Sequence, residues 1–246
     1  MSELWYASGK EKYKENEPCF FDSDDYAWAT DIKKYWSTIK EEVRKLIEEQ
    51  DKKFTSNSYL GIATNNGWSS LSYLFWGSRI PGKDLKTQCS QLANYLEGIP
   101  GIVSVSFSRL APQTTIKEHR GDTNAVLRCH LGIEIPAGLP DCGIRVGGEE
   151  KSWKEGEWLF FNDAHKHMAW NNTDKRRIVL IVDVVRPEFL NKQKNICATI
   201  RTRHIIFHLG KKSKLINTAP GFIKSFLFNS LYLLVYTVKA LRNSSL

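Results

Sequence analysis

Two histidines and an arginine mark the part of the sequence that could do chemistry. His119 and His167 occur in separate strand-like stretches, and Arg177 opens the stretch that follows His167. Imidazole nitrogens are good ligands for iron, and a guanidinium group binds a carboxylate through two parallel hydrogen bonds. We therefore hypothesise that residues 108–177 hold one iron ion and one small dicarboxylate side by side.

Strands must position these side chains, because apolar and polar residues alternate with period two around them. In the strand predicted over 126–135, Arg128 and His130 share one face, and Cys129 belongs to the opposite, apolar face, where we expect it to pack in the core. Short strands are predicted over 102–108, 126–135, 142–146, 157–161 and 178–185. The set predicts a mainly β protein, a sandwich or jelly roll.

Helical periodicity precedes the strands. Apolar residues recur at three and four over 27–52, which predicts a packing helix, and a second helix is expected over 85–96, before a glycine and a proline. Residues 54–84 are predicted to be irregular or to form short strands. We expect one folded domain over 1–189, with a helical part (1–100) and a β core (101–189), and we expect residues 1–25 to wrap around it.

The basic charge is concentrated at the C-terminal end. The net charge is +8, yet residues 190–246 contain ten basic residues and no acidic one, so that 1–189 are almost neutral. This tail favours an anionic partner, either a membrane surface or nucleic acid. It lacks Arg-Gly repeats and a recognisable reading helix, so no specific nucleic acid is expected.

An apolar helix is predicted over 222–241 in this tail. The apolar run between Lys224 and Lys239 is shorter than the roughly 20 residues that a spanning helix needs. An interfacial or docking helix is therefore favoured, while a tail anchor or a helix packed on the β core remain open. The five cysteines lack metal-finger spacing and the N-terminus lacks an apolar signal region, so we expect reduced thiols and a cytoplasmic location, either peripheral to a membrane or tail-anchored.

Several motifs in one order resemble a known family. They are HRGDTN (119–124), RCHLG (128–132), WLFFND (158–163), HMAWN (167–171) and RIVLIVDV (177–184). From about residue 102 to 187 the chain resembles the aspartyl/asparaginyl β-hydroxylases. The resemblance implies a double-stranded β-helix of the iron(II)- and 2-oxoglutarate-dependent oxygenases. In this family two histidines bind the iron, and glycine replaces the carboxylate found in most relatives.

The resemblance also assigns roles to residues. It implies that His119 and His167 ligate iron(II), that Gly121 leaves the third protein position vacant, and that 2-oxoglutarate chelates the metal as cosubstrate with O2. Arg177 would bind the far carboxylate of 2-oxoglutarate. The remaining cosubstrate contacts that it implies are Ser108, which would add a hydroxyl donor, and Arg128 and His130, which would contact the carboxylate beside the iron.

Three neighbouring residues offer alternatives. His165 shares a face with His167 in an extended chain and competes with it, although His167 preserves the spacing to Arg177. Asp122 stands where proline is common in the family, and its side chain is expected to face away from His119. Arg176 falls on the opposite face from Arg177 and is expected to be a surface arginine.

The substrate is less determined than the chemistry. The glycine at 121 resembles the peptide-hydroxylating members, which favours hydroxylation of a peptidyl Asp/Asn or a related amino acid. The basic, apolar tail suits a lipid, so a membrane-associated acyl-chain 2-hydroxylase of the same family is the alternative. A non-catalytic β-barrel that binds a carboxylate ligand or a partner protein is the alternative from another class.

Overall fold

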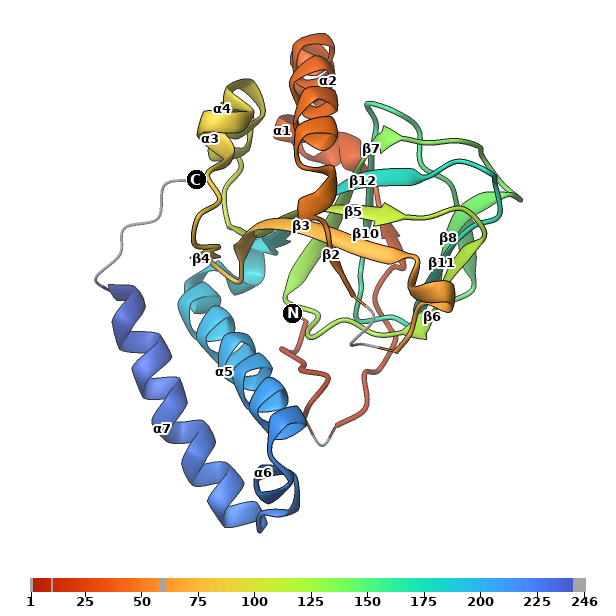
Figure 1. The fold of residues 1–246 in the computed structure, drawn as a ribbon. Coiled ribbons are helices and arrows are strands. Elements are labelled where there is room, and N and C mark those ends of the chain that lie inside the picture. The colour runs from red at the N-terminus through yellow and green to blue at the C-terminus, as the bar shows by residue number, and fades with distance from the viewer. Residues whose placement is uncertain (1, 10, 58–60, 241–246) are drawn as a thin grey trace.

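Two antiparallel sheets form the body of the computed structural model, which describes residues 2–9, 11–57 and 61–240 (Figure 1). The large sheet has the order β1 (Phe20–Phe21), β10 (Trp158–Phe161), β7 (Val126–Glu134), β12 (Arg177–Val185), β5 (Ile102–Leu110), β3 (Trp68–Phe75) and β2 (Thr55–Ser56), and β4 (Ser78–Arg79) pairs with β3. The small sheet has the order β6 (Thr114–His119), β11 (His167–Asn171), β8 (Cys142–Val146) and β9 (Glu149–Lys151). The predicted double-stranded β-helix is confirmed.

Helices cover the outer face of the large sheet. They are α1 (Ala27–Thr30), α2 (Ile32–Glu49), α3 (Leu85–Gln88) and α4 (Ser90–Glu97), and 3-10 helices occupy Ser23–Asp25, Asp51–Lys53, Thr64–Asn66 and Pro187–Lys192. Ile39 and Val43 of α2 and Leu92 of α4 are fully buried against the sheet. The helix predicted over 27–52 is confirmed up to Glu49, with a break at Asp31, and a 3-10 helix follows it. The helix predicted over 85–96 is divided in two at Cys89.

Strand β7 separates two environments. Cys129 and Leu131 point into the core beneath the helices, as predicted for that face. Arg128 and His130 point to the inner side, where the two sheets face each other. Apolar side chains from both sheets fill the rest of this interior: Leu110, Ile116, Ile144, Phe161, Ala169 and Val179.

A helical hairpin follows the body. It consists of α5 (Gln193–Lys212), α6 (Lys214–Thr218) and α7 (Gly221–Ala240). The first half of α5 packs on the sheets through Ile196 and Ile200, and the hairpin then projects away from the body, with α7 antiparallel to α5 (Figure 1). The predicted apolar helix is confirmed up to Ala240, and residue 241 lies outside the described residues. Within the described ranges, no helix is both long and apolar enough to cross a membrane.

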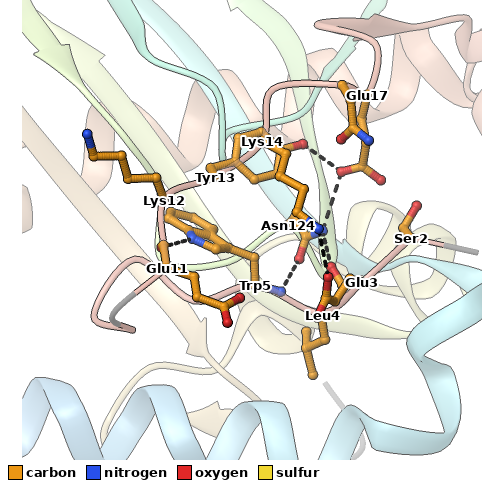
Figure 2. Close-up of a pocket in the computed structure, with 11 residues that line it drawn as sticks. Ser2, Glu3, Leu4, Trp5, Glu11, Lys12, Tyr13, Lys14, Glu17 and Asn124 are labelled. Atoms are coloured by element: carbon orange, nitrogen blue, oxygen red, sulfur yellow. Dashed lines mark hydrogen bonds and ion pairs between the residues drawn. The ribbon is translucent and has the colours of Figure 1, made fainter.

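The N-terminal segment is hydrogen-bonded to the residues that follow His119. The backbone N–H of Trp5 donates to Asn124 Oδ1 (2.7 Å), and Asn124 Nδ2 donates to Glu3 O (2.9 Å) (Figure 2). The Thr123 hydroxyl donates to Trp5 O (2.6 Å). The segment also encloses a polar pocket of about 390 Å³ that contains neither His119 nor His167. This arrangement confirms that the first residues wrap around the body.

Glu17 makes the attachment of the N-terminal segment to the body dependent on pH. Burial opposes its ionisation, but hydrogen bonds from Ser2 and Tyr13 and the ion pair with Arg186 (2.8 Å) outweigh burial and lower its pKa from 4.5 to about 2. A depressed carboxyl pKa stabilises the fold above pH 4.5, and this contribution is lost as the pH falls toward 2.

We expect Glu17→Gln to lower the free energy of unfolding at pH 7 by about 3 kcal/mol at most, because each unit of pKa shift corresponds to about 1.4 kcal/mol. Denaturant unfolding of both proteins from pH 7 to pH 2 checks this. The difference between them should shrink below pH 4.5, and a difference that does not change with pH would contradict the assignment.

Candidate metal and dicarboxylate site

The two motif histidines meet across the small sheet. Strands β6 and β11 are antiparallel neighbours, and their register places His119 directly opposite His167. The centroids of the two rings lie 4.2 Å apart. Residues that are far apart in the sequence therefore present their imidazoles to one point.

Both rings are held in one tautomer. His119 Nδ1 lies 2.8 Å from Lys117 O, and His167 Nδ1 lies 3.0 Å from His165 O. A carbonyl oxygen only accepts, so Nδ1 carries the hydrogen on each ring and Nε2 keeps a lone pair. Burial lowers the pKa of both histidines, that of His167 well below its ordinary value. Two neutral imidazoles with directed lone pairs are what a metal ion requires.

Gly121 and Asp163 occupy the space beside the histidines. A Cβ built on Gly121 would lie 2.0 Å from Asp163 Oδ2, and the Gly121 N–H donates to Asp163 O (2.7 Å). The Asp163 carboxyl cannot swing aside cheaply, because its Oδ2 is paired with Arg128 (2.9 Å). Position 121 therefore has no room for a side chain, which gives a physical reason for the glycine.

Asp163 is a buried carboxyl that the sequence did not single out. Its Oδ1 is buried and has no hydrogen-bond partner among the described residues. Burial, offset by Arg128 and reinforced by the neighbouring acid Asp183, raises the pKa of Asp163.

The donor set fits iron with two protein ligands. In the part of the chain that the structure describes, no three His, Cys, Asp or Glu side chains are grouped to hold a metal ion. His119 and His167 alone provide nitrogen ligands, which leaves coordination positions for a chelating ligand and for water.

Arg177 is a buried cation, and no acidic side chain among the described residues pairs with it. The Arg177 residue is 1% exposed, and its Nη1 donates a long hydrogen bond to Ser108 O (3.5 Å). Nε is buried without a hydrogen-bond partner among the described residues, and burial lowers the pKa to about 10. Burying a guanidinium without a counter-ion costs several kcal/mol, roughly, so proteins normally pair it. The arrangement suits an anionic ligand that completes the pair.

Ser108 lies on β5, next to Arg177 on β12. The hydroxyl oxygen of Ser108 accepts a hydrogen bond from Trp68 Nε1 (3.1 Å), and the side chain is buried. Because the oxygen already accepts from the indole, the hydroxyl hydrogen remains to be donated. Trp68 also lies near the ring of His119, with 6.4 Å between ring centroids, so it connects the two halves of the site.

His130 presents a buried N–H. Its Nδ1 accepts a hydrogen bond from Trp153 Nε1 (3.2 Å), which places the hydrogen of the neutral ring on Nε2. That nitrogen is buried and has no partner among the described residues. Burial, followed by the charges of Arg128 and Arg177, lowers the pKa of His130 well below its ordinary value. His130 therefore offers one neutral N–H donor toward the interior.

Arg128 differs from the other predicted contacts, because carboxylates already bind it. Nε and Nη2 donate to Asp183 (2.8 and 2.9 Å), and Nη1 contacts Asp163 (2.9 Å). These carboxylates outweigh the effect of burial and raise the pKa of Arg128. Two of its five N–H groups remain for a ligand, and its predicted contact with the cosubstrate stays a prediction.

The three residues that the sequence offered as alternatives make contacts away from the histidine pair and Arg177. His165 Nε2 contacts Glu17 O (2.8 Å), so its ring is used by the N-terminal segment. Asp122 contacts His204 Nε2 (3.1 Å) of α5 and faces away from the histidine pair, as expected. Arg176 is paired with Glu134 and Asp51 near the surface, which confirms the prediction for its face.

Two aromatic residues that the sequence analysis did not single out contact the candidate site residues. Phe161 packs edge-on against both His130 (4.9 Å) and His167 (5.5 Å). Trp153 lies under the guanidinium of Arg177, with 4.6 Å from Cζ to the ring, and also donates to His130. Trp153 precedes a predicted strand in a loop-like stretch, so only its aromatic type hinted at a buried role.

Replacing Trp153 by phenylalanine separates its two contacts. The variant keeps an aromatic face for Arg177 but removes the N–H that fixes His130. We expect the affinity for a small dicarboxylate probe, 2-oxoglutarate, to fall by roughly tenfold, as for the loss of a hydrogen bond that orients a buried donor. Equilibrium titration with this probe checks the prediction, and Trp153→Leu, which removes both contacts, should bind it more weakly still. Equal affinities in all three proteins would show that Trp153 only fills space.

Fold and site together define a class: a double-stranded β-helix whose interior holds two facing histidines and a buried arginine. A family model described as aspartyl/asparaginyl beta-hydroxylase matches residues 33–187. The chain belongs to the aspartyl/asparaginyl β-hydroxylase family, as the motifs predicted.

Individual relatives differ in how much they share. The chain is 35% identical over 188 residues to the ornithine lipid ester-linked acyl 2-hydroxylase of Rhizobium tropici, a match that covers 74% of this chain and 66% of that protein. It is 39% identical over 90 residues to human aspartyl/asparaginyl beta-hydroxylase, covering 37% of this chain but 12% of the human protein. A Pseudomonas putida prolyl-4-hydroxylase structure aligns with a TM-score of 0.43 and 15% identity, covering 60% of this chain and 87% of that one.

Proposed function

We propose that this chain is an iron(II)- and 2-oxoglutarate-dependent hydroxylase. One observation carries the proposal: the buried Arg177 lacks an acidic partner and shares an interior with the paired imidazoles of His119 and His167. A metal site alone would not need the arginine, and an anion site alone would not need two neutral histidines. A small dicarboxylate that also chelates a metal explains both.

The bound metal and cosubstrate would supply the oxidising chemistry, in which O2 and 2-oxoglutarate become succinate, CO2 and the oxygen atom inserted into a C–H bond. The chain's own part is binding and orientation. His119 and His167 would hold the metal through Nε2, and their Nδ1 hydrogen bonds keep the rings from turning.

The remaining polar groups would hold the cosubstrate. Arg177 would pair with its far carboxylate, to which Ser108 would donate its hydroxyl hydrogen. His130 would donate from Nε2 to the carboxylate beside the metal, with Arg128 contributing charge. Phe161 and Trp153 surround these donors with apolar surface, which excludes water and strengthens each charge-assisted hydrogen bond.

We propose an acyl chain of a membrane lipid as the substrate. The support is the extent of the match: the Rhizobium lipid hydroxylase aligns with 74% of this chain, whereas the human enzyme aligns with 37%. The alignment with the lipid hydroxylase covers 188 residues, so it extends beyond the motifs that would hold metal and cosubstrate.

Hydroxylation of a peptidyl Asp or Asn is the second candidate. The specific observation in its favour is Gly121, which resembles the peptide-hydroxylating members and which the Asp163 carboxyl makes sterically necessary here. Binding of metal and cosubstrate would be the same for a lipid and for a peptide substrate. The two candidates therefore have to be separated by assaying both substrates with the same protein.

Anaerobic titration with iron(II) and 2-oxoglutarate tests the reaction class. We expect a weak visible charge-transfer band when both are present, and succinate once oxygen is admitted. Ornithine lipid and Asp/Asn-containing peptides are then compared for the gain of one oxygen atom by mass spectrometry. Folded protein that gives no band would remove the iron site and favour the non-catalytic binding barrel.

A further inference from the structure

The helical hairpin concentrates exposed apolar side chains. Among the large apolar side chains exposed in the described residues, all but Tyr35, Leu139 and Leu190 lie between residues 205 and 234. The three most exposed are Leu215 (82%), Phe222 (75%) and Phe226 (74%). These three belong to α6 and the first turns of α7, which form the tip of the hairpin (Figure 1).

Within the described part of the chain, this tip is exposed. Helix α5 ends at Lys212, and residues 221–226 of α7 are all exposed, whereas later α7 residues such as Leu227, Phe228 and Tyr232 are partly buried. Contiguous apolar surface of this kind is uncommon on soluble monomers and marks contact with a protein or a membrane.

Basic residues surround the apolar tip. Lys211, Lys212 and Lys224 are exposed next to it, and no acidic residue occurs from residue 190 to the end of the chain. Lysines beside apolar side chains on a helical element suit an anionic lipid surface, where the ammonium groups meet the headgroups and the apolar groups enter the acyl region. The hairpin would lie in the interface, with its apolar side chains at the boundary between headgroups and acyl chains.

An apolar groove leads from the tip toward the body. It has a volume of about 560 Å³ and lies between α5 and the β3–β4 turn, where Phe75, Ile80, Ile205 and Leu209 line it. Arg201 and Lys212 are among its other lining residues, which include no acid. Its chemistry, apolar with a basic border, therefore continues that of the tip.

The hairpin is attached firmly enough to orient the body. Arg201 Nη2 donates to Val235 O (3.2 Å), and Lys194 Nζ lies 4.4 Å from the ring of Tyr236, so α5 and α7 are linked along their length. His204 of α5 contacts Asp122, three residues after His119. A surface bound by the tip would therefore hold a defined position relative to the site.

We propose that the α5–α7 hairpin docks this chain on an anionic bilayer surface. Leu215, Phe222 and Phe226 enter the acyl region, and Lys211, Lys212 and Lys224 contact the headgroups. The docking does not depend on the hydroxylase chemistry.

Co-sedimentation of the full chain with vesicles tests this, without iron or 2-oxoglutarate. We expect binding to phosphatidylcholine vesicles that contain phosphatidylglycerol, weaker binding without it, and a decrease with added salt. Phe222→Ser combined with Phe226→Ser should weaken binding by at least about tenfold. Lys211→Glu combined with Lys212→Glu should weaken it similarly and flatten the salt dependence.

Matched controls lie on α2, at the far side of the molecule from the tip (Figure 1). Tyr35→Ser removes an exposed ring and Lys33→Glu reverses an exposed charge there, and both should bind vesicles like the wild type. The replaced phenylalanines are exposed, so circular dichroism should show all variants folded.

Three outcomes would overturn the proposal. One is unchanged vesicle binding by the tip variants. Another is a wild-type dimer in vesicle-free solution that Phe222→Ser with Phe226→Ser dissociates, with no vesicle binding, which would make the tip a contact between copies of this chain. The third is salt-sensitive binding to duplex DNA without vesicle binding. None of these results bears on the iron and 2-oxoglutarate titration, so either proposal can fail alone.

Discussion

Alanine at His119 or at His167 is expected to abolish iron-dependent turnover of 2-oxoglutarate. Each ring contributes one Nε2 lone pair, and the described residues offer no third protein ligand to compensate. Loss of groups that only support metal ligands typically costs roughly 10–100-fold, so loss of a ligand should cost at least a hundredfold. Succinate formation and the anaerobic charge-transfer band measure this independently, because the band does not require turnover.

His165→Ala is the matched control, since this histidine lies two residues from His167 but its ring contacts the N-terminal segment. We expect the variant to retain most turnover and to lose some thermal stability, because it removes a buried ring that packs against Tyr13. Retained turnover in His167→Ala together with lost turnover in His165→Ala would show that the metal uses the other histidine.

Changes at Arg177 are expected to raise the 2-oxoglutarate requirement without weakening the fold. Arg177→Lys keeps a charge but loses the planar fork, so the concentration needed for half-maximal succinate formation should rise by roughly tenfold or more. Arg177→Met removes the charge and should raise it further. Saturation curves for the three proteins check the order.

Unfolding measurements distinguish a ligand-binding arginine from a structural one. The Arg177 guanidinium is buried without an acidic partner in the described structure, so removing its charge should leave the free energy of unfolding unchanged or increase it. A structural arginine would instead make Arg177→Met less stable. A loss of stability with unchanged 2-oxoglutarate saturation would remove Arg177 from the site.

Most of the fold could be predicted from the sequence, because the apolar faces that local periodicity indicates are the faces that pack in the core. Alternation on 126–135 predicted which face of β7 is apolar, and the core beneath the helices contains that face. The exception is β3, whose residues Ser69, Ser70 and Ser72 interrupt the apolar pattern. Such a strand is specified by its pairing with β5 rather than by its own sequence.

For the candidate site, the sequence predicted which residues take part. Motif order singled out His119, His167 and Arg177, and the glycine at 121. Sequence could not show that the Arg128 guanidinium is already held by two carboxylates, because Asp163 and Asp183 come from different strands and loops. Nor could it find Trp153, whose contacts with His130 and Arg177 depend on a loop folding back under the sheet.

The sequence by itself determined the class of fold, the ordered set of candidate metal-binding and carboxylate-binding residues, and the separation of a neutral body from a basic tail. Periodicity, residue type, motif order and charge can all be taken from the chain without its tertiary structure. Only the tertiary structure decided which histidines face each other, which tautomers they adopt, and which arginine lacks a partner. It also decided that Leu215, Phe222 and Phe226 are exposed at a hairpin tip. These properties depend on strand register, burial and neighbours distant in the chain, which no local pattern encodes.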